Sequence, residues 1–265
     1  MRFRLNRKRS HFVVFALLGS FFAPVIADQS DSDVVRVAVA ANFYDTLNRL
    51  AEDFERQYEN RKILVSKGSS GGLYAQISQG APYELFFSAD ANRPKMLYQN
   101  NIAVDEPFTY AIGQLVVWSS DHSVETDLSV RVDALINHVA IADPEVAPYG
   151  VAALELFADL GIENIEQKLV RGSSVSQAFQ YVASGNAEIG VVSLAQLMQF
   201  HRVNDTPLEH ANAWLPSLES YPRIEQQAVK LSERVVVDQF VEYLQSSSAQ
   251  SIIQADGYVT ESANP

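Results

Sequence analysis

The pattern of hydrophobic and polar residues changes period several times in the first third of the chain. A nearly unbroken apolar run from Val34 to Ala40 predicts a buried strand. Apolar residues at helical spacing follow from Phe43 to Tyr58 and predict an amphipathic helix. We then expect a strand around Ile63 to Val65, a helix that ends at Ser78, and a strand from Leu85 to Phe87. This βαβαβ order is typical of an open, mostly parallel sheet.

The turn between the second strand and its helix recurs later in the chain. Gly68-Ser69-Ser70 returns as Gly172-Ser173-Ser174, and in both copies a glutamate, Glu84 or Glu188, stands sixteen residues after the first glycine. Glycine permits a tight turn, and serine caps a helix whose first N–H groups stay available to a ligand. Helix capping alone would explain one such turn, but the shared spacing favours a pair of turns that form an anion site.

A second region lies between two crossings of the chain, which the pattern places near residues 111 to 113 and 221 to 226. There Ile112 is expected to begin a new sheet. The pattern predicts strands at Leu115 to Trp118 and Val139 to Ala142, helices within Leu128 to Ile136 and from Val151 to Leu160, and nothing definite from Leu194 to Asn212. After the return it predicts a strand at Ala228 to Leu231 and helices at Val235 to Leu244 and Gln250 to Gln254. We therefore expect lobe 1 to comprise residues 28–111 and 224–265, and lobe 2 residues 112–223.

The first 27 residues have the character of a secretory signal peptide. Five basic residues precede an apolar run from Phe12 to Ala27, and the small residues at its end are typical of a cleavage site. A membrane anchor is the alternative, but a spanning helix needs about 20 apolar residues, and this shorter run contains Pro24. We predict cleavage after Ala27.

The net charge and the lack of cysteine limit which compartment and which binding partners the sequence allows. Five of the 20 basic residues and none of the 32 acidic ones precede residue 28, so the mature chain has a formal charge of −17. Such a charge disfavours nucleic acid and anionic membrane surfaces. The chain has no cysteine, which excludes disulfides, cysteine-based metal sites and a lipid anchor on cysteine. We expect a free protein in the periplasm of a bacterium with two membranes.

Motifs for catalysis are missing from the sequence. The mature chain's four histidines, His122, His138, His201 and His210, lack metal-ligand spacing, and there is no nucleophile elbow, Walker sequence or zinc motif. The serines of the repeated turns have no histidine nearby in sequence to activate them. An exported serine hydrolase is therefore a remote alternative, and we predict a binding protein without enzymatic activity, cofactor or metal-cation site.

Several blocks of the sequence resemble the periplasmic molybdate-binding proteins of ABC transporters. These blocks are Val37 to Phe43, Gly68 to Leu73, Gly80 to Asp90 and Asp143 to Gly150. The resemblance covers nearly the whole mature chain. It implies an α/β fold of two lobes, the type II periplasmic binding protein fold, in which each lobe is a mostly parallel sheet flanked by helices and a two-strand hinge joins them. It also implies a monomer that holds molybdate or tungstate between the lobes and hands it to a membrane permease with its ATPase.

The resemblance further implies a set of ligand residues. They are Asn42 and Ser70 in the first lobe, Tyr149 and Val175 in the second through their backbone N–H groups, and Ala41 as an additional backbone donor. Some family members have a ligating tyrosine where this chain has Ser193. From the residues alone, Asn42 fits the N-cap of the following helix equally well, and Tyr149 fits an aromatic side chain packed beside a turn.

The implied ligand residues suit a fully ionised oxyanion. Molybdate, tungstate and sulfate are dianions without a proton near neutral pH, so their site needs only donors. A phosphate site would gain from a carboxylate that accepts the ligand's proton, and none of the implied positions is acidic. Because separation of molybdate from the smaller sulfate depends on the cavity radius, a carrier for sulfate or another tetrahedral oxyanion stays open as the alternative.

Overall fold

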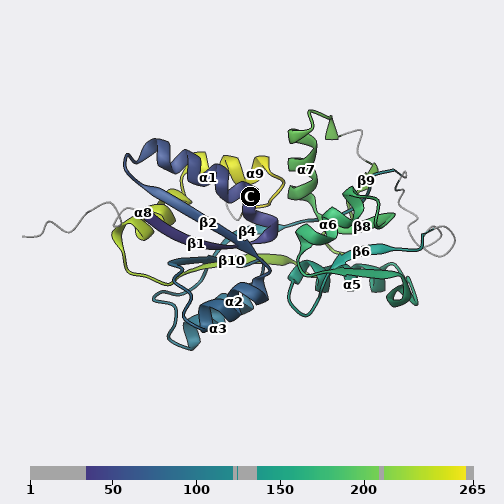
Figure 1. Ribbon diagram of the computed structural model, residues 1–265, viewed down its shortest axis with the longest axis horizontal. Coiled ribbons are helices and arrows are strands. Elements are labelled where there is room, and N and C mark those ends of the chain that lie inside the picture. The colour runs from purple at the N-terminus through teal and green to yellow at the C-terminus, as the bar shows by residue number, and fades with distance from the viewer. Residues whose placement is uncertain (1–33, 122–123, 125–135, 209–211, 261–265) are drawn as a thin grey trace, which may run out of the picture.

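The protein is built on two five-stranded sheets that lie side by side, each with helices against it (Figure 1). The structure is a computed structural model that describes residues 34–121, 124, 136–208 and 212–260. The predicted signal peptide and residues 128–135 of a predicted helix lie outside these ranges. Within them, no helix is long and apolar enough to cross a membrane.

The first sheet has the strand order β2-β1-β3-β10-β4. Its strands are β1 (Val34–Ala40), β2 (Lys62–Gly68), β3 (Leu85–Phe87), β4 (Phe108–Gly113) and β10 (Ile224–Lys230). β1 is parallel to β2 and β3, whereas β10 is antiparallel to both β3 and β4, so β10 alone opposes the other four.

Helices cover both faces of the first sheet because its strands bury side chains on both sides. One face packs against α1 (Tyr44–Gln57), α8 (Val235–Tyr243) and α9 (Ser247–Ala255), and the other against α2 (Ser70–Ser78) and α3 (Asn92–Gln99) (Figure 1). Along β1, Val37 and Val39 join the first of these cores, and Ala38 joins the second. A strand buried in this way has a nearly continuous apolar sequence, as β1 does except at Arg36.

The second sheet repeats this plan with the order β7-β6-β8-β5-β9. Its strands are β5 (Leu115–Ser119), β6 (Val139–Ala142), β7 (Leu169–Gly172), β8 (Ile189–Ser193) and β9 (Asn212–Trp214). Its helices are α5 (Pro148–Asp159), α6 (Val175–Ala183) and α7 (Leu194–Val203), and the short 3₁₀ turn η3 (Ile165–Lys168) precedes β7. In the first half, another 3₁₀ turn, η2 (Ala41–Phe43), follows β1. Here β5 alone opposes the other strands. The predicted fold of two mostly parallel sheets is confirmed.

The two repeated glutamates have the same structural task in each sheet. The Oε2 atom of Glu84 accepts the N–H of Arg36 at 3.0 Å, and that of Glu188 accepts the N–H of His138 at 2.9 Å. Each carboxylate thus ties the start of the third strand of its unit to the first strand. The spacing shared by the two copies therefore reflects a structural repeat.

Two connections join the sheets, and one differs from the prediction. The pattern predicts that Ile112 begins the second sheet, but Ile112 pairs with Glu225 within the first. The chain crosses at Gln114, between β4 and β5. The prediction is wrong because both strands are buried and apolar, so their hydrophobic pattern does not change at the crossing. The limits of the two lobes as folding units stay a prediction.

Candidate functional site

The starts of four helical segments meet at one small cavity between the sheets. The cavity has a volume of about 200 Å³ that includes space open to solvent, and it is lined by all five predicted ligand residues. The remaining lining residues are Ala40, Ser69, Ala89, Ala147, Pro148 and Ser174. None of the described lining residues is charged. The segments that begin here are η2, α2, α5 and α6.

The two Gly-Ser-Ser turns cap their helices with different serines. Ser69 Oγ accepts the N–H of Gly72 at 3.2 Å, whereas Ser174 Oγ accepts the N–H of Gln177 at 3.3 Å. The helices therefore begin at Ser70 and at Val175. These two residues are structural equivalents, although one is a serine and the other a valine. As first residues of helices, both have N–H groups without an acceptor in their own helix.

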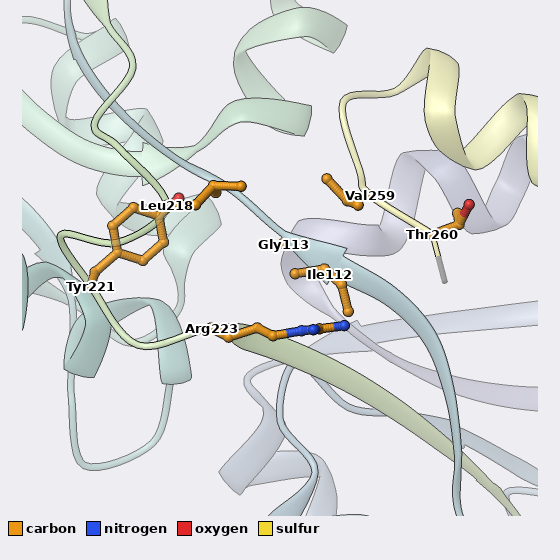
Figure 2. A pocket seen from close by; sticks show the side chains of 7 residues that line it. All are labelled: Ile112, Gly113, Leu218, Tyr221, Arg223, Val259 and Thr260. Carbon is orange, nitrogen blue, oxygen red and sulfur yellow. The ribbon is translucent and has the colours of Figure 1, made fainter. Parts of the chain in front are cut away.

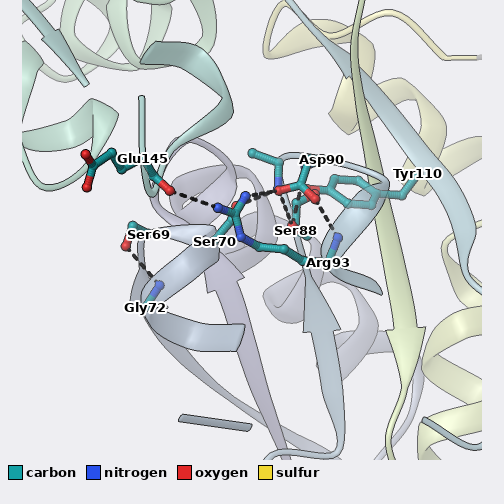
Figure 3. Close-up of polar contacts among 9 residues, drawn as sticks. Ser69, Ser70, Gly72, Ser88, Asp90, Arg93, Tyr110 and Glu145 are labelled. Carbon is teal, nitrogen blue, oxygen red and sulfur yellow. Dashed lines mark hydrogen bonds and ion pairs between the residues drawn. The ribbon is translucent and has the colours of Figure 1, made fainter. Parts of the chain in front are cut away.

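Ser70 adds a side-chain donor to its backbone N–H. The residue is only 2% exposed, and its Oγ accepts the N–H of Ala89 at 3.0 Å (Figure 3). Because this bond uses a lone pair of the oxygen, the hydroxyl proton stays free to be donated. Ser70 lines the cavity, so a ligand there can receive both the hydroxyl proton and the N–H.

Tyr149 lines the cavity, and its buried hydroxyl bonds to other side chains of the protein. Pro148 is the first residue of α5 and has no N–H, so the first amide of this helix is that of Tyr149. The Tyr149 hydroxyl lies 3.4 Å from Ser193 Oγ and 3.3 Å from Gln226 Nε2. Ser193 is therefore a partner of Tyr149 and is not among the described residues that line the cavity.

Asn42 does not cap a helix. The residue pattern alone allows it to be the N-cap of the following helix, and this interpretation is wrong. The side chain makes no capping bond to α1, whose N-cap position is Phe43. Its Nδ2 instead donates to Gln226 Oε1 at 2.9 Å and to Tyr258 Oη at 3.1 Å. The capping interpretation fails because both partners lie far away in sequence. With both amide protons engaged, the remaining donor of Asn42 is its backbone N–H at the start of η2.

A buried cluster of neutral polar groups lies behind the cavity. It consists of Asn42, Tyr110, Tyr149, Gln226 and Tyr258, and we call it the polar cluster. Burial raises the pKa of each of its three tyrosines well above the ordinary value of 10, so these hydroxyls stay protonated. The polar cluster therefore supports the cavity with dipoles and adds no ionised side chain.

Three members of the polar cluster were not identified from the sequence as site residues. Tyr110, Gln226 and Tyr258 lie on β4, on β10 and after α9. A usable signal existed for Gln226, since a glutamine at an inward-facing position of a strand needs a buried polar partner. Nothing in the sequence indicates that this partner is Asn42.

The two halves of the molecule are joined by hydrogen bonds next to the cavity. The N–H of Gly71 donates to the carbonyl of Val146 at 3.0 Å, and Arg93 Nη2 donates to the carbonyl of Glu145 at 3.4 Å (Figure 3). Elsewhere, Ser176 Oγ donates to the carbonyl of Ala41 at 3.3 Å. These bonds join residues of the first sheet's half to residues of the second's, which is the arrangement expected when two lobes close over a ligand.

A second, larger cavity lies beside the β4 connection, with a volume of about 1040 Å³ that includes space open to solvent (Figure 2). Its lining residues are Ile112, Gly113, Leu218, Tyr221, Arg223, Val259 and Thr260. It contains none of the predicted ligand residues and is lined in large part by apolar side chains. A small tetrahedral anion fits the smaller, donor-lined cavity better.

The described histidines lie outside the cavity. His138 Nδ1 is 3.4 Å from Glu188 Oε2, and His201 Nδ1 is 2.9 Å from Thr206 Oγ1. Among the described residues there is no group of three or more potential metal-binding side chains. His122 and His210 lie outside the described ranges.

Comparison with known proteins places the chain in a family. Residues 35–259 match the family described as bacterial extracellular solute-binding protein. The molybdate-binding protein ModA of Rhodobacter capsulatus is 39% identical over 86% of this chain and 88% of that protein. The molybdate-binding protein ModA of Azotobacter vinelandii is 37% identical over 93% of this chain and 98% of that protein.

Solved structures agree with this assignment. The periplasmic molybdate-binding protein of Azotobacter vinelandii has a TM-score of 0.78 and 38% identity over 85% of this chain and 99% of that one. The sulfate-binding protein SubI of Mycobacterium tuberculosis shares the fold, with a TM-score of 0.68 at 13% identity over 85% and 86% of the two chains. The resemblance to molybdate-binding proteins is thus confirmed, and the chain belongs to the bacterial extracellular solute-binding protein family.

Proposed function

We propose that this protein captures molybdate or tungstate in the small cavity and delivers it to the permease of an ABC transporter. The observation that carries the proposal is a cavity lined by neutral donors and without a charged side chain among its described lining. The proposed donors are the N–H groups of Asn42, Ser70, Tyr149 and Val175, the hydroxyl of Ser70, and the N–H of Ala41. A dianion without protons needs donors and no acceptor.

The helix starts supply positive potential where the overall charge is negative. A helix N-terminus carries the equivalent of roughly half a positive charge, and α2, α5 and α6 all begin at the cavity. The mature chain's charge of −17 opposes anion binding only weakly, because surface charges are screened over about 8 Å at physiological ionic strength. Short-range donors at helix starts therefore determine the affinity.

Two alternatives are less well supported. A sulfate carrier draws support only from the fold of a distant relative, whereas two relatives above 30% identity are named molybdate-binding proteins. A serine hydrolase would need a base beside Ser70. The Oγ of Ser70 instead accepts a backbone N–H, and neither described histidine lines the cavity. We therefore favour binding without turnover.

The remaining parts of the proposal concern location and partners. The protein is exported, cleaved after Ala27, and acts as a free monomer in the periplasm, where the bonds between its halves close the cavity over the ligand. The periplasmic relative supports this location. Mass spectrometry of protein from the periplasmic fraction tests it, since an N-terminus at Asp28 is expected and an uncleaved chain would contradict it.

A thermal-shift series with molybdate, tungstate, sulfate and phosphate tests the function. A ligand at about a thousand times its dissociation constant stabilises the fold by roughly 4 kcal/mol. We expect large shifts with molybdate and tungstate and small ones with sulfate and phosphate. An equal shift with sulfate would favour the alternative carrier, and the absence of any shift with molybdate or tungstate would refute the proposal.

A further inference from the structure

Gln226 connects site residues of the two halves through a single side chain. It lies on β10, the strand by which the chain returns to the first sheet, next to a break in the pairing register between Gln226 and Gln227. Its side chain is fully buried. The Oε1 atom accepts from Asn42 Nδ2 at 2.9 Å, and Nε2 donates to the Tyr149 hydroxyl at 3.3 Å. Asn42 lies in η2, directly after the first strand of one half, and Tyr149 lies in the first turn of α5 in the other.

The neighbouring groups determine which end of the Gln226 amide faces which partner. Tyr258 donates its hydroxyl proton to the Asn42 carbonyl at 2.8 Å, so its oxygen can only accept from the Asn42 amide. Asn42 must then present nitrogen on this side, and Gln226 must present oxygen to it. The Tyr110 hydroxyl lies 2.8 Å from the same Gln226 oxygen and 3.1 Å from the Ser88 carbonyl oxygen, and its one proton is shared between these two acceptors. The opposite end of Gln226, a donor, is left for Tyr149.

Gly113 shows how closely the hinge strand β4 packs against these groups. A Cβ atom on Gly113 would lie 2.3 Å from the Tyr149 hydroxyl and 2.5 Å from Gln226 Nε2. Both distances are far below van der Waals contact. A larger residue would therefore displace these two side-chain ends, because the crossing strand lies against the contact between the two halves. A rotation at this crossing would alter that contact.

From this arrangement we infer that Gln226 is a positioning residue for the oxyanion. It holds Asn42 and Tyr149 in the geometry in which their backbone N–H groups face the same cavity, and it thereby couples closure at the hinge to ligand binding. The inference rests on the proposed function. No bond between Gln226 and the ligand is required, since the side chain acts through Asn42 and Tyr149.

The substitution Gln226→Glu tests this role with almost no change of shape. A protonated glutamate keeps one donor and one acceptor end, whereas an ionised one places a negative charge directly behind Asn42. Position 226 is fully buried, and burial raises the pKa of a glutamate above its ordinary value. The substituted group is therefore expected to be mainly protonated at pH 6 and mainly ionised at pH 9. The variant should bind molybdate nearly as well as the wild type at pH 6 and about tenfold more weakly at pH 9.

The wild type should show no such dependence over this range. The titratable groups that face Gln226 are Tyr110, Tyr149 and Tyr258, which burial keeps protonated. Asp90 and Asp256 act on this cluster through their charge. A flat wild-type profile therefore provides the baseline.

Two further variants separate positioning from packing and from added charge. Gln226→Met keeps the volume but removes both polar ends, and it should weaken binding about equally at every pH. Gln227→Glu adds the same charge one residue along, on the other face of β10, and should leave affinity independent of pH. Calorimetric titration with molybdate at pH 6, 7.5 and 9 supplies the dissociation constants, and circular dichroism checks that each variant folds.

The outcomes distinguish this inference from the proposed function. A pH-dependent loss in Gln226→Glu alone supports positioning. An equal, pH-independent loss in Gln226→Glu and Gln226→Met would assign Gln226 to packing, and wild-type affinity in both folded variants would show that it has no part in binding. Either result overturns the inference. Failure of the proposed function would appear differently, as a wild type that does not bind molybdate at any pH.

Discussion

Replacing Ser70 by alanine separates the two hydrogen bonds that its hydroxyl can make. In the protein, Ser70 Oγ accepts the N–H of Ala89 at 3.0 Å, and its proton is free for a ligand in the cavity. Ser70→Ala removes both interactions. One of them contributes to folding and the other to binding, so the two losses are measured in different experiments.

The expected magnitudes follow from the burial and the charge of the partners. A hydrogen bond to a charged ligand contributes about 1.5 to 3 kcal/mol, which corresponds to a dissociation constant roughly 10 to 150 times higher. The Ala89 N–H would lose its partner beside a side chain that is only 2% exposed. An unpaired buried donor costs about 1 to 3 kcal/mol of folding free energy.

The neighbouring serine provides a matched control. Ser69 Oγ caps α2 through the N–H of Gly72, and loss of such a cap costs about 1 kcal/mol of stability. Ser69→Ala should therefore destabilise the fold while it changes the affinity much less than Ser70→Ala does. Urea denaturation measures stability, and calorimetric titration with molybdate measures affinity. A folded Ser70→Ala variant with wild-type affinity would refute the assignment of Ser70 as a ligand donor.

Three further substitutions test other parts of the site and the fold. Gly113→Ala places a methyl group 2.3 Å from the Tyr149 hydroxyl. Urea denaturation should show that the free energy of unfolding falls by about 1 to 3 kcal/mol, and calorimetry should show weaker binding of molybdate. Unchanged stability would contradict the packing described. Asn42→Ala removes a buried bridge of the polar cluster and should weaken binding by about 1 to 3 kcal/mol, whereas wild-type affinity by calorimetry would show that the cluster does not support the site. Burial alone would raise the pKa of Glu188, but hydrogen bonds from its own N–H, from the His138 N–H and from the Asn137 amide outweigh it and lower the pKa below its ordinary value of 4.5. The ionised Glu188 thus stabilises the fold above that value. Urea denaturation should show that the wild type is more stable than Glu188→Gln at neutral pH and that this difference in stability disappears as the pH falls through the lowered pKa. A difference that persists in acid would refute this.

The sequence predicts the elements that are continuous in their hydrophobic pattern. The predicted limits of β1, β3 and β6 agree with the structure, since each is a short apolar run bounded by polar residues or turns. By contrast, the pattern predicts no strand at β9 and no helix at α7. α7 combines a buried start at Leu194 with an exposed end at Val203, and this mixture hides its helical period.

The candidate site could be predicted in part because its backbone donors lie in recognisable turns. Ser70 and Val175 follow serine caps, and a capped helix start after a strand can be read from local sequence. The direction in which a polar side chain points cannot be predicted from local sequence. Asn42 looks like a helix cap, yet its amide bonds to Gln226 and Tyr258, which are distant in sequence and come near only when the sheet and the last helix are assembled.

The central claim is that the oxyanion binds in the small cavity at the helix starts. The most direct test is to locate the molybdenum or tungsten atom of the bound oxyanion in crystals of the mature protein. Anomalous scattering from molybdenum or tungsten marks that position independently of the protein atoms. The account predicts one peak in the cavity between Ser70 and Val175, with the oxygens of the anion accepting the Ser70 hydroxyl and the N–H groups at the helix starts. A peak in the larger cavity beside Arg223, with none between the two helix starts, would contradict it.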